Sequence, residues 1–170
     1  MREFYQWTKL QAMSRELLTT WSDYQIAIDR VLALARKRIC IYDEDLAQLH
    51  FESPARIAIL KMVLSEETLD CLRIALRNSS PLQQQQPLFR NLLKTFSHNS
   101  AVQQTSEQLS HLRDSMILVD DTHALIRFDR DQARSKLLID DGEEVMPYRR
   151  RFEEIWTEGG TPVSATTLGL

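Results

Sequence analysis

Apolar side chains recur along the chain in two patterns, one typical of amphipathic helices and one typical of buried strands. Spacings of three and four residues run over 21–35, 57–64 and 88–96, which predicts three helices. The short run at 39–42 is apolar on both faces, which predicts a strand covered by helices on both sides, and the run at 71–76 predicts a second strand. Helices therefore alternate with strands, as they do in α/β domains.

Capping residues indicate where these helices begin. Thr20, with Asp23 three residues later, is a predicted N-cap, and Ser53 before Pro54 is another. Pro147 is predicted to start a final helix with an apolar face. Three stretches lack a clear pattern. Part of 1–19 is predicted to be helical, the glutamine run 83–86 to be an exposed connection, and 159–170 to be a mobile tail.

A late hairpin has the strongest local signature. Met116–Val119 and Ala124–Phe128 are apolar strands joined by a polar corner, residues 120–123. A corner of four residues places Val119 opposite Ala124 and Met116 opposite Arg127. Two further stretches are predicted more weakly: an edge strand within 102–105, and either a strand or a helix stub at 136–139.

The order of elements predicts an α/β fold with helices packed on a mixed, mostly parallel sheet. A length of 170 residues fits one domain, assigned to 1–158, with 1–19 as an N-terminal extension, 20–158 as the core and 159–170 as a flexible tail. The content of 43% hydrophobic and 26% charged residues is that of a globular protein.

Charge and hydropathy narrow the expected partners. A net charge of −3 gives no overall attraction to nucleic acid, which is therefore not an expected partner. Apolar runs are too short to span a membrane, and the N-terminus lacks a secretory signal, so the cytoplasm is the expected location. Cys40 and Cys71 fall in predicted strands and are expected to be buried structural thiols.

Three charged clusters are candidates for chemistry. At the corner, Asp120 and His123 could perform acid–base chemistry with Ser115 as nucleophile, although such residues more commonly cap backbone groups. The acidic run 43–45 could bind a cation, but a solvated loop is favoured, and no metal or cofactor is expected. The basic run 36–38 is either an anion-binding patch or a helix end matched to the helix dipole, and the second is favoured.

The order of elements and the Val-Asp ending of the first hairpin strand resemble one half of the phospholipase D superfamily. Its signature is His-x-Lys, four residues and Asp, often followed by Gly-Ser-x-Asn; the histidine attacks phosphorus, the lysine holds phosphate, and two halves face each other. With Asp120 as the motif's Asp, Arg113 stands at the histidine position and Ser115 at the lysine position, and 127–130 lacks Gly-Ser-x-Asn.

This resemblance implies a phospholipase D-like half-fold that has lost its catalytic pair and acts as a non-catalytic binding or interaction module, expected as a homodimer. Arg113, Ser115 and Arg127 are candidates for binding a phosphate-containing ligand, unless the arginines pair with Asp114, Asp129 or Asp131. The alternative is a phosphodiesterase or nuclease with a displaced site at His111, assembled across a dimer.

The chain is also similar to uncharacterised bacterial proteins in which a degenerate domain of this type occurs alone or appended to an acetyltransferase domain. The sequence contains no glycine-rich acetyl-CoA loop, because the one glycine pair, Gly159-Gly160, lies in the tail. An acetyltransferase activity is therefore not expected.

Overall fold

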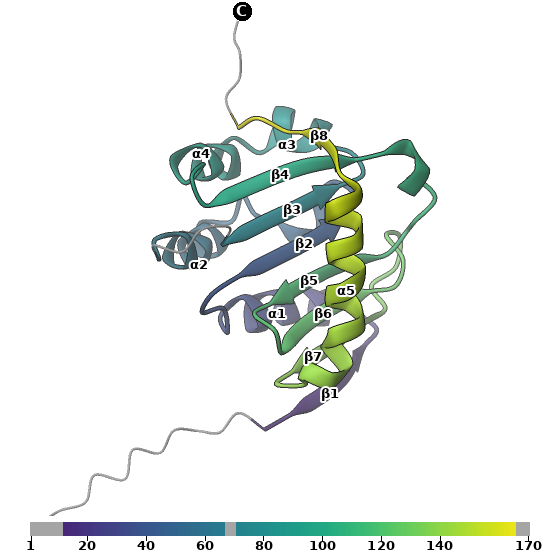
Figure 1. Ribbon diagram of the computed structural model, residues 1–170. Helices are drawn as coiled ribbons and strands as arrows, with labels where there is room; N and C mark the ends of the chain where they lie inside the picture. The colour runs from purple at the N-terminus through teal and green to yellow at the C-terminus, as the bar shows by residue number, and fades with distance from the viewer. Residues whose placement is uncertain (1–11, 67–70, 166–170) are drawn as a thin grey trace, which may run out of the picture.

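The structure, a computed structural model, describes residues 12–66 and 71–165. Its centre is an eight-stranded mixed sheet with strand order β1-β7-β6-β5-β2-β3-β4-β8 (Figure 1). Helices cover both faces, so the predicted α/β class with a mixed sheet is confirmed. The expectation of a mostly parallel sheet is wrong, because two of the seven strand pairings in the described residues are parallel and five are antiparallel. Residues 160–162, expected to belong to a flexible tail, instead form strand β8 (Gly160–Pro162), which pairs antiparallel with β4.

The sheet has a parallel part and an antiparallel part. Strands β2 (Ile39–Asp43), β3 (Leu72–Leu76) and β4 (Ser100–Thr105) are parallel. The hairpin strand β5 (Ser115–Val119) then pairs antiparallel with β2. The remaining strands continue outward from β5 in antiparallel pairings: β6 (His123–Arg127), β7 (Ser135–Ile139) and β1 (Ser14–Leu18).

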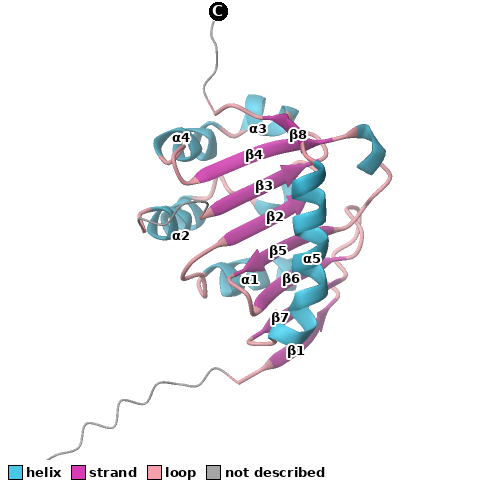
Figure 2. Cartoon of the chain, in the orientation of Figure 1, coloured by secondary structure: helices cyan, strands magenta, loops and turns pink. Residues whose placement is uncertain are grey.

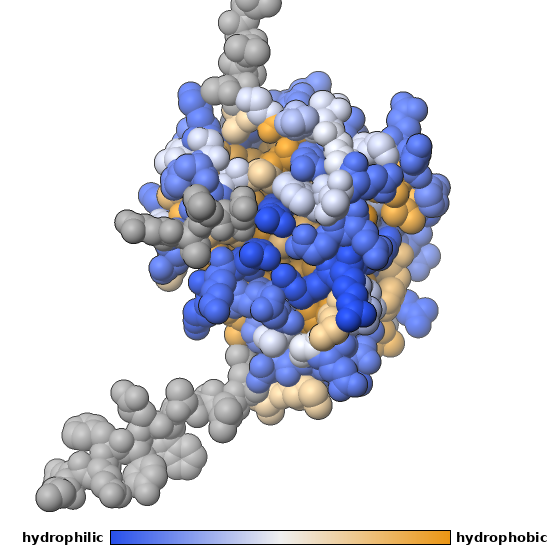
Figure 3. Space-filling view, in the orientation of Figure 1, coloured by the Kyte–Doolittle hydropathy of each residue, from blue (hydrophilic) through white to orange (hydrophobic). Residues whose placement is uncertain are grey.

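Four helices pack on one face of the sheet and one helix crosses the other face (Figure 2). The first group is α1 (Trp21–Leu32), α2 (Pro54–Leu64), α3 (Ser80–Gln85) and α4 (Pro87–Thr95). The single helix is α5 (Gly142–Glu158), and the surface on its side is predominantly hydrophilic (Figure 3). Within the described residues, no helix is long and apolar enough to cross a membrane.

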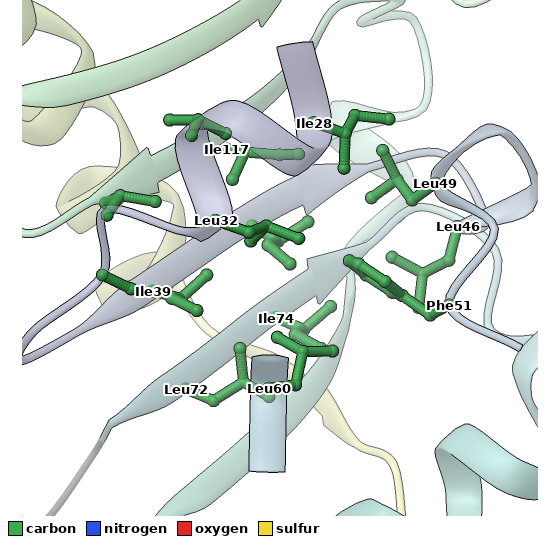
Figure 4. Packing of buried hydrophobic residues seen from close by; sticks show 14 of the residues in the cluster. Ile28, Leu32, Ile39, Leu46, Leu49, Phe51, Leu60, Leu72, Ile74 and Ile117 are labelled. Atoms are coloured by element: carbon green, nitrogen blue, oxygen red, sulfur yellow. The ribbon is translucent and has the colours of Figure 1, made fainter. Parts of the chain in front are cut away.

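Alternation along the central strands supplies two apolar cores. Ile39 and Ile41 of β2 face α1 and α2, whereas Cys40 and Tyr42 face α5. On the first face, Ile28 and other buried side chains of the helices meet the strand residues (Figure 4). Burying both faces explains why β2 is apolar throughout.

Several expected elements differ in the structure. Residues 14–18, assigned to a partly helical extension, form strand β1, and 83–85, expected as an exposed connection, end helix α3. Helix α5 begins five residues before Pro147, which lies inside it. The proline has no N–H to donate to the Glu143 carbonyl, so the second turn of the helix lacks one intrahelical hydrogen bond.

The register of the hairpin is shifted by one residue from the prediction. Val119 lies opposite His123, and Ser115 lies opposite Arg127. The corner therefore contains three residues, 120–122, and Arg127 shares a face with Ser115. The left-handed conformation of Asp120, with φ of 51°, makes this tighter corner.

Candidate functional site

The direction of β5 separates the residues that the sequence placed together. Because β5 runs antiparallel to β2, Ser115 lies at the carboxyl end of β2, whereas Asp120 follows Val119, which lies opposite Ile39 at the amino end. Four residues of strand, or roughly 13 Å, separate the two ends. Ser115, Asp120 and His123 therefore do not converge as a catalytic triad.

The polar corner has a structural role in the loop that precedes β2. The Asp120 carboxylate accepts hydrogen bonds from the backbone nitrogens of Arg36 (3.1 Å), Lys37 (2.8 Å) and Arg38 (3.0 Å). An anion-binding arrangement of three successive N–H groups is thus filled by a carboxylate of the same chain. Capping of backbone groups, the favoured interpretation of the corner, agrees with these contacts.

His123 is also engaged with the backbone. Its Nδ1 accepts a hydrogen bond from the Asp140 nitrogen (2.9 Å), and its Nε2 lies 3.3 Å from the Thr122 hydroxyl. Partial burial lowers the pKa of His123, although the charges of Asp120 and Asp140 oppose this shift. An acceptor role for Nδ1 requires a ring without a proton on that nitrogen, so the geometry favours the neutral imidazole.

At the opposite end of the hairpin, a buried ion pair occupies the sheet edge. Arg127 Nη2 lies 3.2 Å from Asp43 Oδ1, and the two side chains are 2% and 1% exposed. The Ser115 hydroxyl donates to the same oxygen of Asp43. The other oxygen, Oδ2, accepts from the backbone nitrogens of Asp45 (3.2 Å) and Leu46 (2.7 Å), so this carboxylate is fully engaged.

The Arg127 guanidinium is enclosed by aromatic rings as well as by oxygen atoms. Its Cζ lies 5.2 Å from the ring centroid of Tyr24 and 5.5 Å from that of Trp21. Nη1 donates to the carbonyl oxygen of Arg130 (2.7 Å), while Nε has no hydrogen-bond partner among the described residues. Burial raises the pKa of Tyr24 to about 12, although the Arg127 charge opposes the shift.

A second cluster of charges lies on the α5 face of the same edge. Arg77 Nε donates to Glu44 Oε2 (2.7 Å), and its guanidinium lies 4.7 Å from the ring centroid of Tyr42. Arg151 of α5 pairs with Asp114. Glu44 joins the two faces, because its other oxygen lies 3.1 Å from Nη1 of Arg130, in the loop that also binds Arg127.

Arg113, at the histidine position of the motif, is exposed and paired. Its Nε donates to Asp129 Oδ2 (2.7 Å), and its Nη2 contacts Asp131. The bond from Arg113 lowers the pKa of Asp129 to about 2. This pairing is the alternative that the sequence left open for Arg113, whereas Arg127 pairs with Asp43, a partner that it did not indicate.

A cleft of ≈ 350 Å³ opens beside these ion pairs. Its lining is mostly polar and comprises Glu44, Asp45, Ala47, Gln48, Arg127, Arg130 and Asp131. Leu46, beneath it, has the left-handed φ of 67°, a strained conformation for leucine that its bond to Asp43 helps to hold. We define the carboxyl-edge surface as this cleft together with Arg113, Asp114 and Asp129.

The described residues include no group of three or more His, Cys, Asp or Glu side chains that could hold a metal ion. The acidic run 43–45 is divided, with Asp43 turned inward to Arg127 and Glu44 bound to Arg77 and Arg130. Cys40 and Cys71 are both buried, and neither forms a disulfide bond within the described residues. His111 is exposed in the loop before β5.

Arg77 was missed by the sequence analysis, and Asp43 was considered only as a possible cation ligand within the acidic run, not as the partner of Arg127. Both stand at the ends of parallel strands, where the chain leaves the sheet. A strand that ends in a charged residue directly after an apolar run could have indicated them, because carboxyl ends of parallel strands share one edge. The hairpin's contribution to that edge required knowing that β5 pairs with β2.

Comparison with solved structures defines the class as a phospholipase D-like fold. Nuc from Salmonella typhimurium, a phospholipase D family member, has a TM-score of 0.61 at 11% identity, with 90% of this chain and 99% of that chain covered. NucT from Helicobacter pylori has a TM-score of 0.59 at 13% identity, with 89% and 100% covered. At such identities the likeness shows the fold alone.

A third similar structure is TrmBL2, described as an archaeal chromatin protein with a novel mode of DNA binding. Its TM-score is 0.63 at 12% identity, and the match covers 91% of this chain and 56% of TrmBL2. This chain thus spans little more than half of that neighbour's length. The net charge of this chain led to the expectation that nucleic acid is not a partner. With a DNA-binding protein among the similar structures, that expectation is not supported.

The sequence matches a family over most of its length. Residues 20–165 match the family described as domain of unknown function (DUF7931), and the chain belongs to this family. No curated protein matches the sequence.

Proposed function

We propose that this protein is a non-catalytic interaction module that associates with a second copy of itself through the carboxyl-edge surface. The observation that carries the proposal is the closed Asp43–Ser115–Arg127 cluster. Ser115 stands at the lysine position of the phospholipase D signature and donates its hydroxyl hydrogen bond to Asp43. A buried cluster whose carboxylate is fully engaged has a structural role at the place where those enzymes have their reactive groups.

The neighbouring residues support the absence of catalysis. Arg113, at the histidine position, is not a nucleophile, and its Nε and Nη2 already contact carboxylates. His123, with its neutral ring, lies at the other end of the hairpin. Covalent phosphoryl transfer needs a nucleophile beside a group that stabilises the phosphate, and this arrangement supplies no such pair.

The alternative is a phosphodiesterase with a displaced site at His111, whose exposure leaves it accessible to a second copy. The test is hydrolysis of bis(p-nitrophenyl) phosphate and of plasmid DNA by the wild type, His111→Ala and His123→Ala. We expect no turnover above the rate of a buffer control for any of the three proteins. Turnover that is lost in His111→Ala but kept in His123→Ala would establish the alternative instead.

A phosphate-containing ligand at Arg113, Ser115 and Arg127 remains a prediction, and the charges argue against it. Arg113 and Arg127 each contact a carboxylate, so phosphate would have to displace an existing partner. The test of this ligand is thermal unfolding at increasing concentrations of inorganic phosphate. Sodium sulfate and sodium chloride at matched ionic strength are the controls. A rise in Tm specific to phosphate that is absent in Arg113→Ala would identify such a ligand.

Self-association is supported by the mixture of charges at this surface. Arg130 and Asp131 alternate in sign, with side chains 38% and 71% exposed. A twofold axis near such a pair would bring each charge against its opposite on the second copy. Light scattering at tens of micromolar is expected to give the mass of a dimer, and Arg130→Glu is expected to give a monomer. A monomeric wild type would refute the association.

A further inference from the structure

The opposite edge of the sheet carries a second charged surface, which we call the amino-edge surface. Its six members are positively charged and come from three parts of the chain, namely the loop before β2, strand β3 and helix α5: Arg36, Lys37, Arg38, Arg73, Arg149 and Arg150. Arg36, Lys37 and Arg150 are exposed. The hydrophilic surface on the α5 side of the molecule is seen in Figure 3.

Three of these arginines converge from separate elements. Arg38, Arg73 and Arg149 are all near enough to Cys40 for their charges to oppose the rise in its pKa, which burial takes to about 11. Cys40 is the second residue of β2 and faces α5. These three arginines therefore lie on the α5 side of the sheet, around the amino end of β2.

Nearby carboxylates form ion pairs with some of the cations of the amino-edge surface but not with the others. Asp121 pairs with Arg149 (3.2 Å), and Glu153 pairs with Arg73 (3.4 Å). The Asp120 carboxylate is directed to the backbone nitrogens of 36–38. In the part of the chain that the structure describes, the side chains of Arg36, Lys37, Arg38 and Arg150 form no ion pair.

Asp120 explains how a run of three basic residues stays presented to solvent. Its carboxylate fixes three successive backbone N–H groups, and this fixes the loop that carries the side chains. A loop held in this way presents its cations with little further ordering of the backbone on binding. This contrasts with the carboxyl-edge surface, where Arg113 and Arg127 each contact a carboxylate.

We propose that the amino-edge surface binds the phosphate backbone of a nucleic acid. Unpaired cations spread over an open surface suit a ligand with repeated phosphates, whereas a single phosphate is held best where several donors enclose it. Arginine and lysine contacts of this kind are independent of base sequence. The site is separate from the carboxyl-edge surface, so the inference extends beyond the proposed self-association and does not depend on it.

The test is fluorescence anisotropy of a labelled 20-base-pair DNA duplex titrated with the full chain at several salt concentrations. If four cations contact phosphates, log K is expected to fall with log salt at a slope of about −3.6. The variant Arg36→Ala/Lys37→Ala/Arg150→Ala replaces three exposed members. We expect its affinity to fall by at least about tenfold at low salt, and its slope to weaken by about 3.

The matched control is Lys61→Ala/Lys94→Ala/Arg134→Ala, which removes the same charge from exposed cations elsewhere. Circular dichroism and Tm confirm that both variants are folded; if the triple variant is not, Arg36→Ala/Arg150→Ala takes its place. The proposal is overturned if the control loses as much affinity as the variant, or if the wild type binds neither the duplex nor one of its single strands. It is also overturned if the wild type binds phosphatidylglycerol vesicles but no duplex or single strand.

Discussion

At the scale of single residues, the most consequential feature is the ion pair between Arg127 and Asp43. Both side chains are almost completely buried, so neither charge can regain water when its partner is removed. Arg127→Met keeps the apolar stem and deletes the charge. We expect it to lower the free energy of unfolding by about 3 kcal/mol, the size typical of a broken buried pair, in urea denaturation.

The controls separate burial from charge. Arg113→Met removes an arginine of an exposed pair and is expected to leave the urea midpoint nearly unchanged. Adding Asp43→Asn to Arg127→Met is expected to recover part of the loss, because the remaining charge is then removed. If Arg127→Met and Arg113→Met destabilise equally, the buried pair has no special role.

His123 makes a prediction about pH. Burial lowers its pKa in the folded protein below the ordinary value of 6.5, so the unfolded chain takes up a proton more readily. The stability contributed by neutral His123 is therefore complete above about pH 7.5 and decreases as the pH falls through 6.5. The Asp140 N–H would also lose its acceptor when Nδ1 is protonated.

The measurement is urea unfolding between pH 8 and pH 5 for the wild type and for His123→Asn, whose amide oxygen can accept the same hydrogen bond. We expect the wild type to lose more stability than the variant over this range, because acidic groups common to both cancel in the difference. Parallel curves for the two proteins would show that His123 does not titrate with folding.

The residues of the site show why sequence identified some and missed others. Arg113 and Ser115 were recognisable because they stand at the histidine and lysine positions of a motif, and Arg127 because the predicted hairpin brings it to the same end as Arg113. Asp43 lies 72 positions from Ser115, and no local pattern links the two; the link is the pairing of Tyr42 with Met116. Contacts between distant segments depend on strand order, which hydrophobic periodicity does not specify.

At the scale of elements, two predicted N-caps differ in their chemistry. The Thr20 hydroxyl accepts a hydrogen bond from the Asp23 nitrogen (3.1 Å), as predicted, whereas Ser53 precedes α2 without a side-chain capping bond. Thr20→Ala is expected to cost about 1 kcal/mol of unfolding free energy and Ser53→Ala much less. Thermal or urea unfolding of both variants measures the difference, and equal costs would contradict it.

Strongly periodic elements were predictable and weakly apolar ones were not. Helix α1 and strand β2 have long buried patterns that a sequence shows directly. Strand β1 alternates between half-buried and exposed positions, because it forms an edge of the sheet, and its charged residues Arg15 and Glu16 resemble a helix surface. Helix α3 buries Leu82 alone, too little for a period of 3.6 to emerge.

At the scale of the whole molecule, one sheet separates two charged edges and two apolar cores. The reversal of β5 against β2 puts the hairpin's arginine end at the carboxyl edge and its acidic corner at the amino edge. One surface has arginines paired with carboxylates, and the other retains unpaired cations. Loss of self-association and loss of nucleic-acid binding should therefore be separable by substitutions at different edges.

The same architecture predicts that the protein unfolds as one unit. Strand β2 contributes side chains to both cores, so neither face can lose its packing while the sheet stays intact. Trp21 lies beside Arg127 on the α1 face, and Trp156 stacks on Phe152 on the α5 face. In a Trp7→Phe background, Trp156→Phe leaves a reporter for the first face and Trp21→Phe leaves one for the second.

Each of these two single-tryptophan proteins is expected to show one urea transition whose fluorescence midpoint coincides with its own midpoint by far-ultraviolet circular dichroism. Comparing the two probes within each protein is necessary, because either substitution can itself shift stability. Coincidence in both proteins means that the two cores unfold together with the sheet. A tryptophan signal lost well before the circular dichroism signal, on either face, would mean that α1 or α5 separates first and that the sheet does not couple them.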